Sequence, residues 1–213
     1  VYNSKKEMQS YMIGLALSQY LWVTHYKMFN HLKEVLQQNK EKIKSYLEIG
    51  PGHGLFFKEA INTIGNDCKY TAIDISKVSL ELTKSIISFF QLNYTDIKYI
   101  NDDMLNITST NLYDFIVMGE VLEHVEKPKF LLDKLNTLLD INGQAFISTC
   151  VDCPTIDHVY HFKSVSEIRD ILKQSKFEIV SEKVLPVEKL PMDEIIKRKI
   201  TINYSTIIKK GNS

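Results

Sequence analysis

The chain has 213 residues, of which 44% are hydrophobic and 24% charged, as is typical of one well-buried globular domain. Lysine plus arginine and aspartate plus glutamate each number 26, so the formal net charge is zero. This balance argues against a nucleic-acid partner, because nucleic-acid-binding domains usually carry a basic excess. No apolar run approaches the roughly 20 residues that span a bilayer, so we expect no membrane segment.

Residues 5–38 are expected to be helical, because apolar residues recur there at partly regular helical spacing. Gly14 is expected to soften or break this helix. Aromatic residues are dense over residues 11–29, and packing is the preferred explanation for them. We also expect residues 1–40 to form an N-terminal helical lid over a cofactor.

From residue 44 the pattern alternates between strand and helix. The candidate strands are 45–50, 69–74, 96–100, 113–118 and 143–149, and the candidate helices are 54–64, 76–91 and 127–140. The strands are short and mostly apolar, as expected for strands that helices cover on both faces. This alternation predicts an α/β fold with a parallel sheet and right-handed crossovers.

After residue 154 the pattern changes. We expect a helix over 164–175, strands over 177–184 and 201–208, and a short helix over 192–199. The segment 185–200 is long for a hairpin connection, so we expect it to fold over the active face.

The three cysteines, Cys68, Cys150 and Cys153, are expected to be reduced thiols in a cytoplasmic protein. Cys150 and Cys153 have the C-x-x-C spacing of redox and metal-binding pairs. However, they follow a predicted strand instead of opening a helix, and no second pair completes a zinc site. The sequence therefore favours plain thiols.

A glycine-rich run, Gly50-x-Gly52-x-Gly54, joins a predicted strand to a predicted helix. Glu48 lies inside that strand, and Asp74 ends the next strand, 20 residues after Gly54. Glycines let a backbone approach a ligand closely, and an acid at the end of the next strand can hold a ribose diol. The pattern therefore predicts a nucleoside-containing cofactor.

The same run argues against a nicotinamide dinucleotide. Its fingerprint is G-x-G-x-x-G, whereas Phe56 stands at the second position after Gly54, and no Tyr-x-x-x-Lys pair stands out. An NAD-dependent oxidoreductase is kept as a rival interpretation.

The G-x-G-x-G form after an acid resembles motif I of class I S-adenosylmethionine (AdoMet) methyltransferases. Three further segments resemble the family's later motifs in the correct order, namely Ala72–Ser76, Asn101–Leu105 and Asp114–Val125. Leu138–Gln144 matches the usual approach to strand five. The resemblance covers about residues 45–150.

The resemblance implies a single methyltransferase domain over 1–213 with a Rossmann-like, seven-stranded, mostly parallel sheet. The last strand would be antiparallel, and helices would cover both faces. Residues 41–150 would form the AdoMet-binding core and residues 151–213 the acceptor-side loops and closing strands. AdoMet would lie at the carboxyl ends of the strands, where open α/β sheets bind ligands.

The resemblance also implies roles for individual side chains. Asp74 would bridge the ribose hydroxyls, and Asp103, favoured over Asp102, would contact the adenine amino group. The implied cofactor-binding set is Glu48, Gly50, Gly52, Gly54, Asp74, Ile75, Asp103, Met104 and Glu120.

Glu120, Glu123 and His124 follow at i, i+3 and i+4, so a helical turn would place them on one face. This Glu-x-x-Glu-His segment resembles ubiquinone-pathway O-methyltransferases and small-RNA ribose methyltransferases, in which it helps bind a divalent metal beside the acceptor hydroxyl. Carboxylate oxygens suit Mg²⁺. The alternative is a helix start without metal, since spacing identifies no fourth ligand.

Histidines near the predicted acceptor loop are candidates for a general base, because the histidine pKa lies near working pH. His161 or His158 could take this role, alone or paired with His124. His53, inside the glycine loop, is interpreted as a loop residue only.

Methyl transfer is an in-line displacement, and alignment of the two reactants alone can lower its barrier. No Asn-Pro-Pro-Tyr-type motif follows the fourth predicted strand, where Gly119-Glu120-Val121-Leu122 stands, which disfavours methylation of exocyclic base nitrogens. The sequence therefore favours O-methylation of a small hydroxylated metabolite. N- or C-methylation and a non-catalytic AdoMet-binding partner are open alternatives, and the oligomeric state is not indicated.

Overall fold

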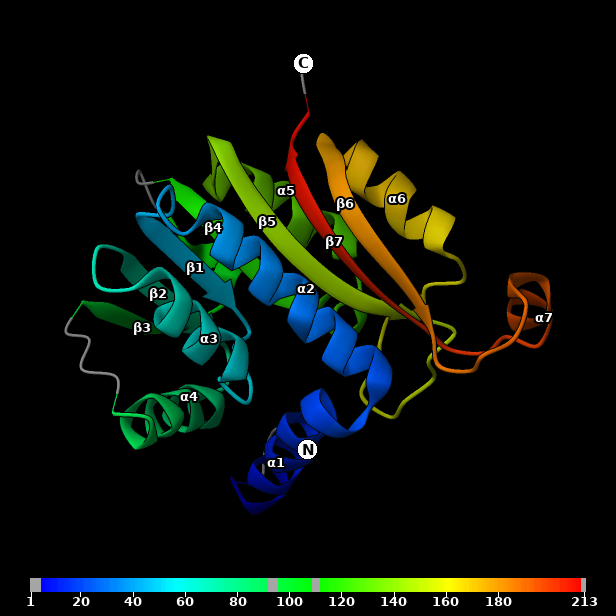
Figure 1. Ribbon diagram of the computed structural model, residues 1–213, viewed down its shortest axis with the longest axis horizontal. Helices are drawn as coiled ribbons and strands as arrows, with labels where there is room; N and C mark the ends of the chain where they lie inside the picture. Colours follow the sequence, from blue (N-terminus) through cyan, green and yellow to red (C-terminus); the bar gives the residue numbers. More distant parts are fainter. Residues whose placement is uncertain (1–4, 92–95, 109–111, 212–213) are drawn as a thin grey trace.

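The computed structural model describes residues 5–91, 96–108 and 112–211, and within these residues the centre is a seven-stranded sheet (Figure 1). The strands are β1 (Ser45–Ile49), β2 (Lys69–Asp74), β3 (Ile97–Asn101), β4 (Tyr113–Gly119), β5 (Leu139–Val151), β6 (Phe177–Pro186) and β7 (Ile202–Lys210). Their spatial order is β3-β2-β1-β4-β5-β7-β6. β7 is antiparallel to both neighbours, whereas β1 to β5 pair in parallel. The predicted Rossmann-like sheet with an antiparallel last strand is confirmed.

Helices cover both faces of this sheet. They are α1 (Lys5–Leu21), α2 (Val23–Asn39), α3 (Leu55–Ile64), α4 (Lys77–Phe89), α5 (Pro128–Leu138), α6 (Val165–Gln174) and α7 (Met192–Lys197). The helices α2, α3 and α4 share one apolar core with the sheet, and α5 and α6 share the other. Along β4, Phe115 and Val117 enter the first core and Ile116 and Met118 the second, because successive strand side chains point to opposite faces. This explains why residues 115–118 of β4 are all apolar.

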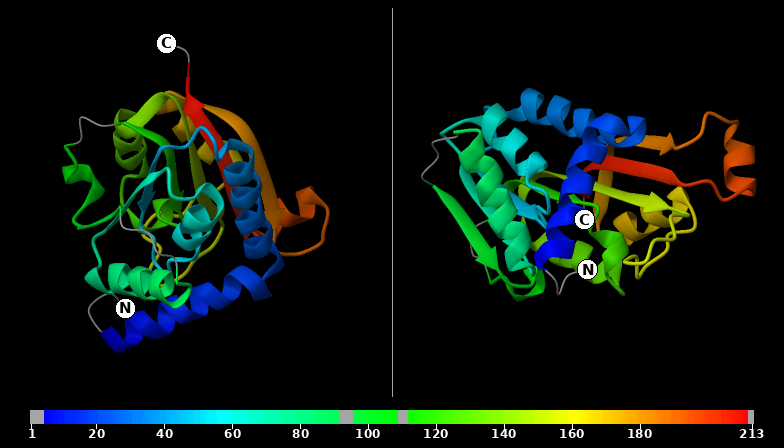
Figure 2. Two further views of the ribbon diagram at one scale, coloured as in Figure 1. Left: turned by 60° about the vertical axis from the view of Figure 1, so that its left-hand side comes forward. Right: turned by 90° about the horizontal axis from the view of Figure 1, so that it is seen from below.

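Residues 5–38 are helical as expected, but the helix breaks at Trp22 and not at Gly14. Trp22 has extended backbone (φ −100°, ψ 122°) and separates α1 from α2, whereas Gly14 lies inside α1. Beyond the break α2 packs along the sheet, while α1 turns away and packs against α4 (Figure 2). One straight helix could not make both contacts.

β5 is longer than the predicted strand over 143–149. It begins at Leu139, directly after α5, and its register against β4 shifts between Tyr113 and Phe115. Gly143 lies at this irregularity, where a Cβ atom would come within 2.9 Å of the Tyr113 carbonyl oxygen. The helix predicted over 127–140 ends at Leu138, and β5 begins with the next residue.

The segment 185–200 contains the expected short helix, α7, but does not fold over the active face. It lies beyond the ends of β6 and β7, at one edge of the molecule (Figure 1). Ile195 of α7 is buried in the apolar core, and no residue of 185–200 lines the large cavity described below.

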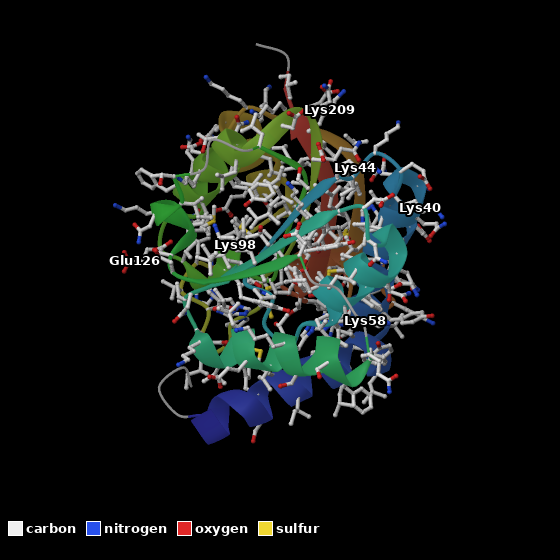
Figure 3. All side chains as sticks on the ribbon, turned by 90° about the vertical axis from the view of Figure 1, so that its left-hand side faces the viewer. Lys40, Lys44, Lys58, Lys98, Glu126 and Lys209 are labelled. Carbon is white, nitrogen blue, oxygen red and sulfur yellow. The ribbon has the colours of Figure 1, made fainter. Side chains whose placement is uncertain are left out.

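The labelled lysines in Figure 3 come from separate elements. Lys44 precedes β1, Lys98 lies on β3 and Lys209 on β7, and all three are exposed.

Among the described residues, no helix has the length and apolar character needed to cross a membrane.

Candidate cofactor and acceptor site

A cavity of about 710 Å³ opens where the parallel strands end. Loops that follow β1, β2, β3, β4 and β5 line it, and α1 contributes Tyr11, Met12 and Leu15 to its wall. Its volume is within the usual range for small-molecule and cofactor sites. Of the two N-terminal helices, only α1 contributes to this wall, and no residue of α2 lines the cavity.

The loop between β1 and α3 is shaped by left-handed glycines. The φ angles of Gly50, Gly52 and Gly54 are 66°, 52° and 76°. A Cβ atom at Gly50 would meet Val121 at 2.8 Å, and one at Gly54 would meet the Thr83 backbone at 2.8 Å. Only glycine therefore fits these two positions. The backbone of Gly50 and Gly52 faces the cavity as a cradle for a ligand.

His53, within this loop, caps the helix that follows. Its Nδ1 accepts a hydrogen bond from the Leu55 backbone N–H at 3.1 Å, and burial lowers the pKa of the imidazole to about 4. This agrees with its interpretation as a loop residue, although its side chain also lines the cavity.

Glu48 of β1 lies at the floor of the cavity and is 2% exposed. Its Oε2 accepts a hydrogen bond from the Tyr46 hydroxyl at 2.6 Å. Burial raises the pKa of this carboxyl to about 8, although the Tyr46 hydrogen bond opposes the shift. A cationic ligand group in the cavity would favour its ionised form.

Asp74, at the end of β2, also lines the cavity. Its Oδ1 accepts the Ser76 backbone N–H at 2.8 Å, which fixes the carboxylate at the start of α4. Burial raises the Asp74 pKa to about 6, and backbone hydrogen bonds partly offset that rise. Ile75, the next residue, lines the cavity and is largely exposed.

Asp102, Asp103 and Met104 follow β3 and line the same cavity. Asp103 caps a short 3₁₀ turn, because its Oδ1 accepts the Leu105 backbone N–H at 2.9 Å. Asp102 accepts from the Asp103 N–H and from Asn106. Met104 is buried, so its side chain forms part of the wall.

The predicted helical turn over Glu120, Glu123 and His124 is wrong. Glu120 has a positive φ of 53°, and a 3₁₀ turn begins only at Leu122 and ends at His124. Ligand atoms of Glu123, His124 and His158 lie within 4.8 Å of one another, so these three side chains converge. Glu120 is not part of this group, although it also lines the cavity.

Glu120 and Glu123 each have a buried carboxylate oxygen without a hydrogen-bond partner. The Oε1 atoms of Glu120 and Glu123 have no hydrogen-bond partner, whereas Glu123 Oε2 accepts from the Thr149 hydroxyl at 2.8 Å. Burial raises the pKa of each carboxyl. Such buried acceptors are costly unless a ligand or ion satisfies them.

Of the three histidines predicted as bases, His124 and His158 line the cavity and His161 does not. His161 is exposed. The rings of His124 and His158 pack edge to face, with centroids 5.1 Å apart. His124 Nδ1 lies 2.9 Å from the Asp157 carbonyl oxygen and 3.8 Å from the Asp157 carboxylate.

Sequence reasoning gives no role to Tyr11 or Asp157. The Tyr11 hydroxyl donates a hydrogen bond to Asp157 Oδ2 at 2.6 Å, which ties α1 to the loop after β5. Tyr11 belongs to the aromatic-rich stretch for which packing is the preferred explanation, and Asp157 adjoins His158. No local pattern shows that the two residues meet across 146 positions of sequence.

The donors gathered at His124 do not match Mg²⁺. Magnesium prefers oxygen ligands in an octahedral arrangement, whereas the group contains one carboxylate, from Glu123, and the imidazoles of His124 and His158. The magnesium ligands proposed from sequence therefore gain no support.

Comparison with known proteins agrees with this geometry. A family model described as a methyltransferase domain matches residues 23–182. The ubiquinone biosynthesis O-methyltransferase of Rickettsia typhi is 28% identical, over 86% of this chain and 83% of its own length. The mitochondrial ubiquinone biosynthesis O-methyltransferase of Schizosaccharomyces pombe is 30% identical, over 50% of this chain and 38% of its own length. The chain thus spans less than half of several curated relatives.

The fold is also shared with solved structures. The N-methyltransferase NodS of Bradyrhizobium japonicum, in complex with S-adenosyl-L-homocysteine, superposes with a TM-score of 0.69 at 18% identity, over 91% of both chains. The 1,6-didemethyltoxoflavin-N1-methyltransferase of Burkholderia thailandensis superposes with a TM-score of 0.67 at 13% identity, over 96% of this chain and 87% of that protein. The family match covers most of the sequence, and the glycine loop and acids line one cavity. The chain therefore belongs to the methyltransferase-domain family and has the fold of class I S-adenosylmethionine-dependent methyltransferases.

Proposed function

We propose that this chain methylates a hydroxyl group of a small molecule. Bound S-adenosylmethionine supplies a methyl group that its sulfonium activates for displacement. One observation carries the proposal: the cavity that Gly50, Gly52 and Asp74 line continues to His124 and Asp157. The loops after β1 and β2 would hold the cofactor, and those after β4 and β5 would hold the acceptor in line with it.

His124 is the proposed general base. A carbonyl oxygen only accepts hydrogen bonds, so the contact with the Asp157 carbonyl places the hydrogen of neutral His124 on Nδ1. Its Nε2 then carries the lone pair and can take the hydroxyl proton of the acceptor as the methyl group moves. The Asp157 carboxylate, 3.8 Å from Nδ1, would stabilise the imidazolium that forms.

The relatives' names support oxygen as the methylated atom. Besides the ubiquinone biosynthesis O-methyltransferases, the malonyl-[acyl-carrier protein] O-methyltransferase of Halalkalibacterium halodurans is 26% identical over 58% of this chain. The chain covers 46% of that protein, so its acceptor is not transferred here.

Calorimetric titration tests the cofactor assignment. We expect S-adenosylhomocysteine to bind and NAD to show no heat of binding, because the third glycine of a dinucleotide fingerprint is missing. Binding of NAD without binding of S-adenosylhomocysteine would refute the proposal.

His124→Gln tests the base. With an acceptor found by screening small hydroxylated compounds for S-adenosylhomocysteine formation, we expect kcat to fall by about 100-fold or more, the scale of general-base catalysis. The affinity for S-adenosylhomocysteine should not change. His161→Gln, in an exposed histidine outside the cavity wall, should leave kcat near the original value. A larger loss in His161→Gln than in His124→Gln would assign the base to His161 instead.

A further inference from the structure

Two thiols and an imidazole converge behind the acceptor end of the cavity. Cys150 lies near the end of β5, Cys153 follows in the next turn, and ligand atoms of both lie with one of His158 within 4.8 Å of one another. Asp152, between the cysteines, has a left-handed φ of 48°, and the two Sγ atoms lie within 4.8 Å of each other. The backbone turn therefore brings the C-x-x-C pair together.

The spacing of these atoms suits a tetrahedral ion. Cys150 Sγ lies 3.8 Å from His158 Nδ1. With Zn–S near 2.3 Å and Zn–N near 2.0 Å, a tetrahedral site places sulfur and nitrogen about 3.6 Å apart. Coordination through Nδ1 would replace the present contact of this nitrogen with the Cys153 carbonyl oxygen, at 2.7 Å.

Glu123 faces the same imidazole but belongs to a second group, with His124 and His158, and not to the cysteine group. The residue is 1% exposed, and its Oε1 has no hydrogen-bond partner. A ligand atom of Glu123 lies within 4.8 Å of one of His158. The backbone N–H groups of Val159 and Tyr160 donate to the Glu123 carbonyl oxygen at 2.8 and 2.9 Å, which holds this loop against Glu123.

We propose that Cys150, Cys153 and His158 bind a zinc-class divalent cation, with a water molecule in the fourth position. Thiolates and imidazoles select such ions, whereas Mg²⁺ prefers oxygen donors. Binding converts both thiols to thiolates, and their two protons pass to solvent. Neither cysteine lines the cavity, so the ion lies behind its wall and fixes the loop that carries Asp157 and His158.

Cobalt titration of the full chain tests the site. The reduced, chelator-treated protein is titrated with Co²⁺ while its absorption spectrum is recorded. We expect a thiolate-to-cobalt charge-transfer band and tetrahedral visible bands, which Zn²⁺ abolishes and excess Mg²⁺ does not. Metal analysis of protein loaded with Zn²⁺ and then dialysed gives a second readout.

Variants assign the ligands. Cys153→Ala should weaken Co²⁺ binding more than about 100-fold, since removing even an outer partner of a ligand costs 10- to 100-fold. Cys68→Ala removes a buried thiol outside the cluster and should leave the titration unchanged. Binding of S-adenosylhomocysteine to each variant serves as the check that it is folded.

Three results would overturn the proposal: no Co²⁺ binding by the reduced protein, binding without the thiolate band, or equal affinity in Cys153→Ala. Because S-adenosylhomocysteine binding is measured separately, a failed metal site and a failed methyltransferase proposal are distinguishable.

Discussion

Asp74 is a carboxyl group whose surroundings favour its neutral form in the absence of a ligand. Burial raises its pKa to about 6, while the Ser76 backbone N–H holds one oxygen in place. The proposed ribose hydroxyls would donate hydrogen bonds to this group. The residue is therefore fixed in position before the cofactor binds.

Asp74→Ala should weaken S-adenosylhomocysteine binding by about 1–3 kcal/mol, the scale for losing a charged hydrogen-bond partner. Calorimetry measures this change. The matched control is Asp67→Ala, because Asp67 is exposed and precedes the opposite end of β2. Equal affinities in Asp74→Ala and the unmodified chain would remove Asp74 from the ribose role.

Residues whose roles depend on local backbone could be predicted from sequence. Gly50 and Gly54 follow from the strand-turn-helix pattern, and their positive φ angles agree with it. The geometry at Glu120 could not be predicted, because its left-handed backbone interrupts an otherwise helical spacing. The choice between His158 and His161 likewise depends on how the loop after β5 lies against Glu123.

Among the elements, α1 contacts both halves of the cavity. Met12 lies against Gly52 of the glycine loop, and Tyr11 donates to Asp157 on the acceptor side. The break between α1 and α2 at Trp22 allows α1 to take this position. The break depends on tertiary packing, which the spacing of apolar residues over 5–38 does not reveal.

Tyr11→Phe should loosen this closure. A hydrogen bond to a charged group contributes about 1.5–3 kcal/mol, so we expect S-adenosylhomocysteine to dissociate at least several-fold faster. Stopped-flow measurement of the dissociation rate checks this. Tyr20→Phe, in an exposed tyrosine of the same helix, is the control. If both variants release the ligand at the original rate, the Tyr11–Asp157 bond does not hold α1 closed.

At the scale of the whole molecule, the sheet order was predictable because alternating strand and helix permits few topologies. The carboxylates that this topology collects were predicted as site residues, but their burial was not. Glu48, Glu120 and Glu123 come from β1 and the segment after β4, which are neighbours in the sheet, and burial raises the pKa of all three. The ligand-free molecule thus has an acidic centre that prefers to be protonated.

This centre should make the ligand-free protein less stable as pH rises. A glutamate in the unfolded chain has its ordinary pKa of 4.5, whereas burial raises the pKa of folded Glu48 to about 8. Between these values the folded state holds a proton that the unfolded chain has lost, so the Glu48 contribution is fully present below pH 4.5 and is lost as pH rises through about 8. Glu48→Gln should reduce the slope of the unfolding free energy against pH by up to about 1.4 kcal/mol per pH unit. Buried histidines contribute a slope of opposite sign, but it cancels in the difference between variant and unmodified chain.

Urea unfolding of the ligand-free protein at several pH values between about 5 and 8 measures these slopes. Glu126→Gln, in an exposed glutamate (Figure 3), is the control and should reproduce the unmodified profile. We expect Glu48→Gln to gain stability relative to the unmodified chain as pH rises, because the glutamine has no proton to lose. A constant difference between the two across this range would show that Glu48 is already ionised in the folded protein, as it would be if a cation lay beside it.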